Sequence, residues 1–313
     1  MVSRHYLRIK TMQALYSYNA NPKASMAQAE TDLEKSIRAC HELFVWLFCL
    51  LPEITFYRLK KLESLKGKYN PTEEDLNPNT KFVDNVVIKG IEECQELEAL
   101  KNSYHVNWDD DTDLISKLYR QIEQLPEYET YMSKSDRSFN EDKLFVLTII
   151  EKVFANNELL NWHLGEINLH WINDYNEAIT MLYQNVKSFT EKEPFKIDGI
   201  YADADAKVLA RNLFRKTLQN ADEYKQLINS KLQNWELERI INMDVLLMEM
   251  ALCELLEFPS IPIKVTLNEY IEISKWYSSD KSKVFINGIL DRLIVDLRES
   301  GRIVKTGRGL YQN

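Results

Sequence analysis

Glycine and proline are scarce in this 313-residue chain, with eight of each. So few turn-forming residues disfavour collagen-like, β-solenoid and loop-rich architectures. The glycine-rich patterns G-x-G-x-x-G and G-x-x-x-x-G-K-[ST] are both absent from the sequence. We therefore expect neither of the phosphate-binding loops that these patterns form.

Cysteine and long apolar runs are also sparse. Cys40, Cys49, Cys94 and Cys253 include no C-x-x-C pair, so their spacing favours reduced, buried thiols over a zinc site or a disulfide scaffold. The longest uncharged apolar run, residues 43–51, covers about half of a membrane span of roughly 20 residues. The charged N-terminus has no apolar core of the kind found in a signal peptide. We expect a cytoplasmic protein without a membrane partner.

Basic residues are outnumbered, with 39 Lys and Arg against 48 Asp and Glu and a net charge of −9. A large basic face for bulk DNA is therefore not expected, although a local basic patch remains open. Residues 1–22 contain Arg4, His5, Arg8 and Lys10 but no acid. On a helix, Arg4 and Arg8 lie one turn apart with His5 beside them.

This basic ridge suits single-stranded RNA, because guanidinium groups bind phosphate oxygens and stack on unpaired bases. The alternative is an ordinary solvated helix start. Cations at a helix N-terminus oppose the macrodipole at a cost of about 0.3–1 kcal/mol, which favours a functional cause.

No catalytic or metal-binding constellation is visible. His163, Glu166 and His170 share one helix face, but a polar surface explains them better than a metal site. The acids of residues 109–113 lack the glycine and distal Glu of a calcium loop. No strand–turn–helix elbow surrounds a Ser or Cys. We expect no enzyme, no metal and no cofactor.

Helical periodicity runs through almost the whole chain, and no segment alternates as a strand does. Residues 3–19 place Leu7, Thr11 and Leu15 on one face. A second helical stretch covers residues 25–67, with Pro52 as a candidate break. The later helices are expected in the following ranges: 81–104, 113–124, two helices within 138–189, several helices from 202 onward, and a last helix over 279–297.

The C-terminal third carries an ordered set of motifs. Its elements are Asn234-Trp235-Glu236-Leu237-Glu238-Arg239, Met250-Ala251-Leu252-Cys253-Glu254-Leu255, Ile261-Pro262-Ile263-Lys264-Val265-Thr266-Leu267-Asn268-Glu269 and Lys283-Val284-Phe285-Ile286-Asn287-Gly288-Ile289-Leu290-Asp291. In order and spacing this set resembles the NusB family of transcription antitermination factors. Gln13-Ala14-Leu15-Tyr16-Ser17, after the basic start, is similar to the first helix of that family.

Several of these residues also have a structural interpretation. Pro262 stops the preceding helix, and Thr266 with Glu269 has the spacing of a capping box. Arg239 and Asp244 are placed to tie neighbouring helix ends. Gly288 inside a helix costs about 1 kcal/mol against Ala, which predicts the close approach of another helix. The buried stripe of the last helix is predicted to be Ile286, Ile289, Leu290, Leu293 and Leu297.

The resemblance implies an all-α fold of two small helical bundles and a binding function. It implies pairing with the ribosomal protein NusE on boxA-type single-stranded RNA, within a bacterial transcription elongation complex that makes ribosomal RNA. The residues that it implies for RNA binding are Arg4, His5, Arg8, Gln13, Tyr16, Lys281, Lys283 and Phe285. The residues that it implies for the protein partner are Glu254, Lys264 and Glu269. Tyr16 and Phe285 could equally pack in the core.

The chain departs from the family in length and in its thin arginine-rich start. Relatives are near half this length, so we expect four parts: a first helix with the basic ridge (1–23), an inserted helical region (24–199), a NusB-like core (200–298) and a basic flexible tail (299–313). One rival interpretation is a helical protein–protein scaffold that has lost RNA binding. A second is an enzyme, because such domains also occur fused to RNA cytosine methyltransferases, but the required glycine-rich domain and Cys motif are not visible.

Overall fold

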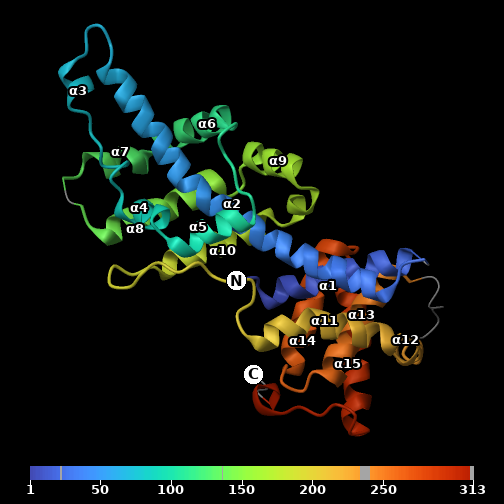
Figure 1. The fold of residues 1–313 in the computed structure, drawn as a ribbon. Helices are drawn as coiled ribbons and strands as arrows, with labels where there is room; N and C mark the ends of the chain where they lie inside the picture. Colours follow the sequence, from blue (N-terminus) through green and yellow to red (C-terminus); the bar gives the residue numbers. More distant parts are fainter. Residues whose placement is uncertain (22, 136, 233–239, 311–313) are drawn as a thin grey trace. The chain divides into compact units, whose positions relative to one another are not determined.

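The computed structural model describes residues 1–21, 23–135, 137–232 and 240–310. Every regular element within these residues is helical, so the predicted all-α class is confirmed (Figure 1). The chain divides into two compact units. Unit 1 contains Met1–Val2 and Arg38–Ile200, and unit 2 contains Ser3–Ile37 and Tyr201–Asn313.

Unit 2 is built from both ends of the sequence. Its elements are α1 (Arg4–Ala20), the first part of α2 (Met26–Lys66), α11 (Ala204–Gln219), α12 (Ala221–Asn229), α13 (Asn242–Glu257), α14 (Ile263–Tyr277), α15 (Ser282–Glu299) and the 3₁₀ helix η4 (Gly307–Leu310). The helix α13 is buried along most of its length, and α1, α11, α12, α14 and α15 all contact it. It is therefore the central element of unit 2.

The predicted first and last helices of unit 2 are confirmed. Ser3 caps α1 by accepting a hydrogen bond from the backbone N–H of Tyr6 at 3.1 Å. In α15 the five predicted stripe residues are all at most 7% exposed. The amphipathic spacing that predicted both helices reflects their burial against the centre of the unit.

Unit 1 is a second helical assembly. Its elements are the rest of α2, α3 (Glu73–Leu76), α4 (Val86–Glu92), α5 (Gln95–Ser103), α6 (Thr112–Glu123), α7 (Pro126–Ser133), α8 (Phe139–Ile149), the π-helix η1 (Ile150–Phe154), α9 (Glu158–Ile167), the 3₁₀ helix η2 (Leu169–Asn173) and α10 (Tyr175–Ser188). Its core contains the apolar run 43–51 of α2 and a group of packed aromatic rings, among them Phe82, Tyr119 and Phe145.

Two details of unit 1 differ from the prediction. Pro52 lies inside α2 and does not end it. The residues before Pro52 and Ile54 after it are buried, so tertiary packing outweighs the local cost of a helical proline, about 3 kcal/mol. Residues 138–189 form more than two helices, because a π-turn and the left-handed residue Asn156 (φ 59°) interrupt the pattern.

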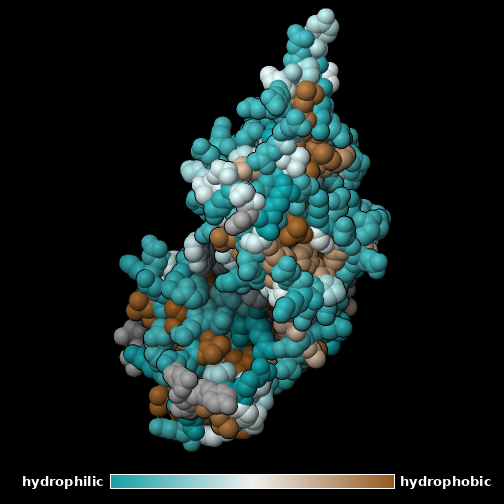
Figure 2. Space-filling model, turned by 90° about the vertical axis from the view of Figure 1, so that its left-hand side faces the viewer, coloured by the Kyte–Doolittle hydropathy of each residue, from teal (hydrophilic) through white to brown (hydrophobic). Residues whose placement is uncertain are grey.

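One helix among the described residues, α2, is long and apolar enough to cross a membrane. However, 78% of its most apolar stretch is buried inside the structure, which is typical of a core helix. On the face drawn in Figure 2, hydrophilic residues predominate and hydrophobic residues form small separate groups.

Candidate functional site

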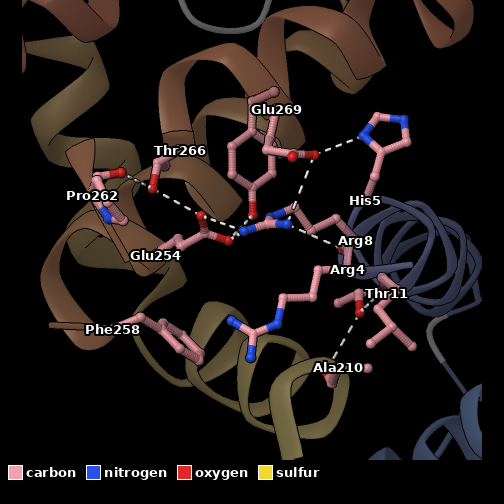
Figure 3. A network of polar contacts seen from close by, with 12 residues as sticks. Arg4, His5, Arg8, Thr11, Ala210, Glu254, Phe258, Pro262, Thr266 and Glu269 are labelled. Carbon is pink, nitrogen blue, oxygen red and sulfur yellow. Dashed lines mark hydrogen bonds and ion pairs between the residues drawn. The ribbon is translucent and has the colours of Figure 1, made fainter. Parts of the chain in front are cut away.

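Arg8 of α1 lies inside unit 2, where it pairs with Glu254 of α13 (Figure 3). The side chain of Arg8 is 2% exposed and that of Glu254 is fully buried. Nε of Arg8 donates to Oε2 of Glu254 at 2.7 Å, and Nη2 donates to Oε1 at 2.9 Å. Thr266 and Tyr270 of α14 donate their hydroxyls to the same carboxylate at 2.8 and 3.4 Å. One bidentate ion pair therefore joins three helices.

The two charges of this pair stabilise each other. Burial disfavours the charge on Arg8, but the adjacent Glu254 outweighs burial and holds the pKa of Arg8 above its ordinary value. Burial raises the pKa of Tyr270, so its hydroxyl remains a donor. Removing one partner would leave a buried, unpaired charge, at a cost of about 3–5 kcal/mol. The pair is a structural element of unit 2.

The other two basic side chains in the first turn of α1 are paired with acids nearer the surface. Nη2 of Arg4 lies 2.9 Å from Asp203, the N-cap residue of α11, and Nδ1 of His5 lies 2.6 Å from Oε2 of Glu269. Burial alone would raise the pKa of Glu269, but His5 and Arg8 outweigh burial and lower it. These acids offset the unfavourable position of cations at a helix N-terminus.

The start of α15 is fixed by Asp244 of α13. Its buried carboxylate accepts hydrogen bonds from the hydroxyls of Ser278 and Ser282, the latter at 2.8 Å. Lys281 and Lys283 are exposed at this helix start, and the first turn of α15 contains no acid. Two ammonium groups therefore lie beside the carboxylates of Asp244 and the exposed Asp280, and the backbone N–H groups of Ser282, Val284 and Phe285 already donate to Ser279 and Lys281.

Tyr16 faces solvent beside a groove of about 480 Å³ at the same end of α13. The groove is lined by Tyr16, Asn19, Ala20, Lys225, Asn242, Val245, Leu246 and Glu249. Burial raises the pKa of Glu249 to about 7, although Nζ of Lys225 lies 3.9 Å from its carboxylate. Asn242, Val245, Leu246 and Glu249 recur at i, i+3, i+4 and i+7, so the groove lies on a different face of α13 from Asp244 and the start of α15.

The C-terminal segment packs along unit 2. Nζ of Lys305 donates to the backbone oxygens of Glu254 and Phe258 at 3.4 and 3.0 Å, and burial lowers the pKa of Lys305 to about 8. The backbone N–H of Thr306 donates to the oxygen of Pro259 at 3.0 Å. A Cβ on Gly309 would lie 1.9 Å from that oxygen, so this contact requires glycine. The segment that we predict as a flexible tail thus carries specific contacts up to residue 310.

The residues predicted for RNA and partner binding separate into two groups. The first lies around Glu254 and contains Arg4, His5, Arg8 and Glu269. The second lies around Asp244 and contains Lys281, Lys283 and the partly exposed Phe285, whereas Tyr16 lines the separate groove on another face of α13. Asp244 and Glu254 are about 15 Å apart along α13, at about 1.5 Å per residue.

Burial corrects two of these predictions. Arg8 and Glu254 are enclosed by α1, α13 and α14, so neither reaches a ligand on the surface of this structure. Lys264 is exposed in the first turn of α14, and Gln13 is partly exposed on α1. Sequence reasoning missed Asp203, the acid that pairs with Arg4. The spacing Asp203-x-x-Ala206 at the start of an amphipathic segment could have suggested it as an N-cap.

Two local interpretations of the C-terminal motifs are wrong. Thr266 lies inside α14, whose N-cap is Pro262, and its hydroxyl bonds Glu254 rather than capping the helix. Outside the adjacent backbone of α15 itself, no described atom lies within 4 Å of the Cβ position of Gly288, so no other described helix approaches it closely. Arg239, the predicted partner of Asp244, lies outside the described residues.

Comparisons with known proteins identify the family to which this arrangement belongs. The family model described as the NusB family matches residues 173–295. The transcription antitermination protein NusB of Salinibacter ruber is 44% identical over 108 residues, which cover 34% of this chain and 68% of that protein. The chain belongs to the NusB family. The NusB of Myxococcus xanthus is 37% identical, over 31% of this chain and 69% of that protein.

The NusB match covers only part of the chain. For the NusB of Chloroherpeton thalassium, 39% identity extends over 36% of this chain and 54% of that protein. The family model begins at residue 173 and so includes α10, which we assigned to the insertion from sequence. The helix α1 lies outside this match yet packs in unit 2 with matched helices. No solved structure matches the chain.

Proposed function

We propose that this NusB-family chain is an RNA-binding transcription antitermination factor that pairs with ribosomal protein NusE on boxA-type RNA. It would act in the cytoplasm of a bacterium as part of a transcription elongation complex that makes ribosomal RNA. The observation that carries the proposal is the 44% identity to an antitermination protein across 68% of its length. We assign no catalytic role, because the relatives are named for antitermination and the sequence contains no catalytic constellation.

The start of α15 is the best-supported RNA contact. Lys281 and Lys283 are exposed there, and neither carries an ion pair to an acid within the described residues. Phe285 is partly exposed one turn further on, where a base could stack on its ring. We propose Lys281, Lys283 and Phe285 as the principal RNA-binding surface, with Tyr16 as a separate exposed ring on another face of α13.

The first turn of α1 plays a secondary role in this proposal. Arg4 and His5 are partly exposed but already paired with Asp203 and Glu269. RNA phosphates must compete with these carboxylates, so each contact contributes less than a free cation would. Gln13 is a candidate for a neutral contact to the RNA. Arg8 positions α1 rather than touching RNA.

We further propose that the exposed side of α14 meets NusE. Lys264 is exposed in its first turn, and Glu269, five residues further along the helix, is 23% exposed. Residues 1–23 and 200–298 would supply the NusB-like parts, with residues 24–199 as a helical insertion and 299–313 as a tail. Because chain segments on both sides of the insertion build unit 2, the insertion can be long without interrupting the core around α13.

The double change Lys281→Ala and Lys283→Ala tests the RNA surface. Removing two phosphate contacts should weaken binding of a labelled boxA-like RNA by about tenfold or more, and should flatten the slope of log affinity against log salt by about 1.4. Fluorescence anisotropy at several salt concentrations gives both numbers. The matched control is Lys187→Ala with Lys192→Ala, two exposed lysines of unit 1. Equal losses for both pairs would contradict a local site.

A second candidate function is a protein–protein scaffold with the NusB fold and no RNA binding. The pairing of Arg4 and His5 with acids favours it, because little free positive charge remains on α1. Under this alternative, the chain would bind NusE with the same affinity whether or not boxA-like RNA is present. A third possibility is an RNA cytosine methyltransferase. In that case its cofactor, S-adenosylmethionine, would raise the melting temperature of the chain in a thermal-shift assay.

A further inference from the structure

A group of large apolar side chains is exposed on unit 1, whereas the residues assigned to RNA belong to unit 2. Trp162, Ile167, Leu169 and Ile172 are 64%, 43%, 78% and 51% exposed, and they belong to the consecutive elements α9 and η2. We call these four residues the apolar platform. Exposed Trp and Leu side chains clustered within eleven residues are typical of an interaction surface rather than of ordinary solvated helices.

The platform is a single folded surface. The element η2 packs closely against α9. A Cβ built on Gly165 of α9 would lie only 3.1 Å from Cγ1 of Ile172 in η2. Gly165 is one helical turn from Trp162, so Ile172 and Trp162 lie on neighbouring positions of the same side. The missing side chain at Gly165 thus allows η2 to pack closely and to add its apolar residues to those of α9.

The platform rests on a rigid base. Trp171 of η2 is 1% exposed, and its ring centroid lies 5.5 Å from that of Trp46 in α2. Trp46 in turn packs against buried Trp108, whose Nε1–H donates to the backbone oxygen of Trp46 at 3.2 Å. A surface held in place by packed indoles loses little conformational entropy when a partner binds.

Lys and Arg are absent from the two chain segments that contain the platform and its border. Residues 153–186, which contain it, include no Lys or Arg, and residues 102–116 include none either. These two segments meet where the ring of His163 stacks on Trp108 and its Nε2 lies 2.9 Å from Asp111. The exposed acids of the two segments are Asp109, Asp110, Asp113, Glu158 and Glu166. Of these, Asp113 is already paired with Lys117 at 2.6 Å.

The exposed apolar side chains and the nearby acids together indicate which kind of partner fits the platform. Acids would repel RNA phosphates and anionic lipid headgroups, so neither fits. A second copy of the chain in a symmetric dimer would place acid against acid. A partner helix with an apolar stripe flanked by Lys and Arg fits this surface. Its stripe would pack against the exposed apolar side chains, and its basic residues would pair with the nearby carboxylates. We propose that the apolar platform binds a basic amphipathic helix of another protein, with Trp162 and Leu169 as its anchors.

The test uses the full chain and three labelled peptides of equal length. The first is an amphipathic helix of Leu and Lys, the second has the same composition in scrambled order, and the third has Glu in place of Lys. Fluorescence anisotropy should show the first peptide bound about tenfold more tightly than the scrambled one, and no binding of the third. Tight binding of the Leu/Glu peptide, or equal binding of the scrambled one, would overturn the proposal.

Variants locate the binding. Trp162→Ser with Leu169→Ser should abolish the preference for the amphipathic peptide while leaving the melting temperature unchanged, because both side chains are exposed. The matched control is Val86→Ser with Leu144→Ser, two exposed apolar residues elsewhere in unit 1. A preference that survives the platform variant, or is lost in the control, would contradict the proposal.

Two further measurements keep the proposal falsifiable if the serine variant folds poorly. Glu158→Lys with Glu166→Lys leaves the apolar residues in place. This variant should bind the Leu/Lys peptide at least about tenfold more weakly at low salt, because its added cations repel the peptide. Sedimentation of the wild-type chain should show no dimer that depends on the platform residues. A dimer lost in the platform variant would identify a second copy as the occupant and overturn the proposal.

Discussion

At the residue scale, the two arginines at the start of the chain have different roles although they lie one turn apart on α1. Arg8 is buried against Glu254 and joins α1 to α13 and α14. Arg4 is partly exposed and pairs with Asp203 at the surface. A basic sequence motif therefore contains one structural cation and one cation that a ligand can still reach.

The structural role of Arg8 predicts a large loss of stability when it is replaced. Arg8→Met leaves Glu254 buried without its counter-ion, so the free energy of unfolding should fall by about 3–5 kcal/mol. Urea denaturation followed by circular dichroism measures this change. Arg4→Met, the matched control, should cost at most about 1 kcal/mol. Equal costs for the two variants would show that Arg8 is not the buried partner of Glu254.

The pairing of Arg4 predicts a gain of function. Asp203→Asn should release Arg4 for a phosphate, while Asn keeps the N-cap hydrogen bond that Asp203 accepts from Ala206. Affinity for boxA-like RNA should rise by about two- to fivefold, since one more surface cation becomes available. Asp222→Asn, in the exposed first turn of α12, is the control for net charge. An identical gain in that control would attribute the effect to long-range charge alone.

At the element scale, the C-terminal segment is held by contacts that only glycine permits. Gly309→Ala would place a Cβ against the backbone oxygen of Pro259 and displace η4. Trypsin should then cut faster after Lys305 and Arg308, which mass spectrometry would detect. Gly288→Ala, where the added Cβ meets open space, should leave cleavage unchanged and raise stability by about 1 kcal/mol. Unchanged cleavage in Gly309→Ala would show that the segment is not packed as described.

Most helices could be predicted from the sequence, because each buries one apolar face and the spacing of that face is local information. The behaviour of Pro52 could not, since the packing that keeps α2 continuous comes from distant residues. The Thr266-x-x-Glu269 pattern failed as a capping box because the same spacing lies inside a helix when the true N-cap is Pro262.

The candidate site was less predictable than the helices. Whether Arg8 faces solvent depends on Glu254, which is 246 residues away in the sequence. The same holds for Arg4, whose partner Asp203 comes from the far side of the insertion. The exposure of Lys281 and Lys283 was easier to predict, because an N-terminal helical turn beyond the buried stripe projects its long side chains into water.

At the scale of the whole molecule, the chain joins a NusB-family unit to a second helical unit that the family match largely leaves out. Helix α2 contributes residues to both units, and the helices of unit 2 come from the two ends of the sequence. With a net charge of −9, we expect the proposed RNA contact to be local to Lys281 and Lys283 at the start of α15. The platform of unit 1 would serve a different, basic partner.

The central claim is that this protein binds RNA together with NusE. The most direct measurement is fluorescence anisotropy of a labelled boxA-like RNA titrated with the full chain, with and without NusE, at two salt concentrations. The account predicts tighter binding of the mixture than of either protein alone, and weaker binding at the higher salt concentration. Absence of RNA binding in every mixture would contradict it and leave the protein–protein scaffold as the better description.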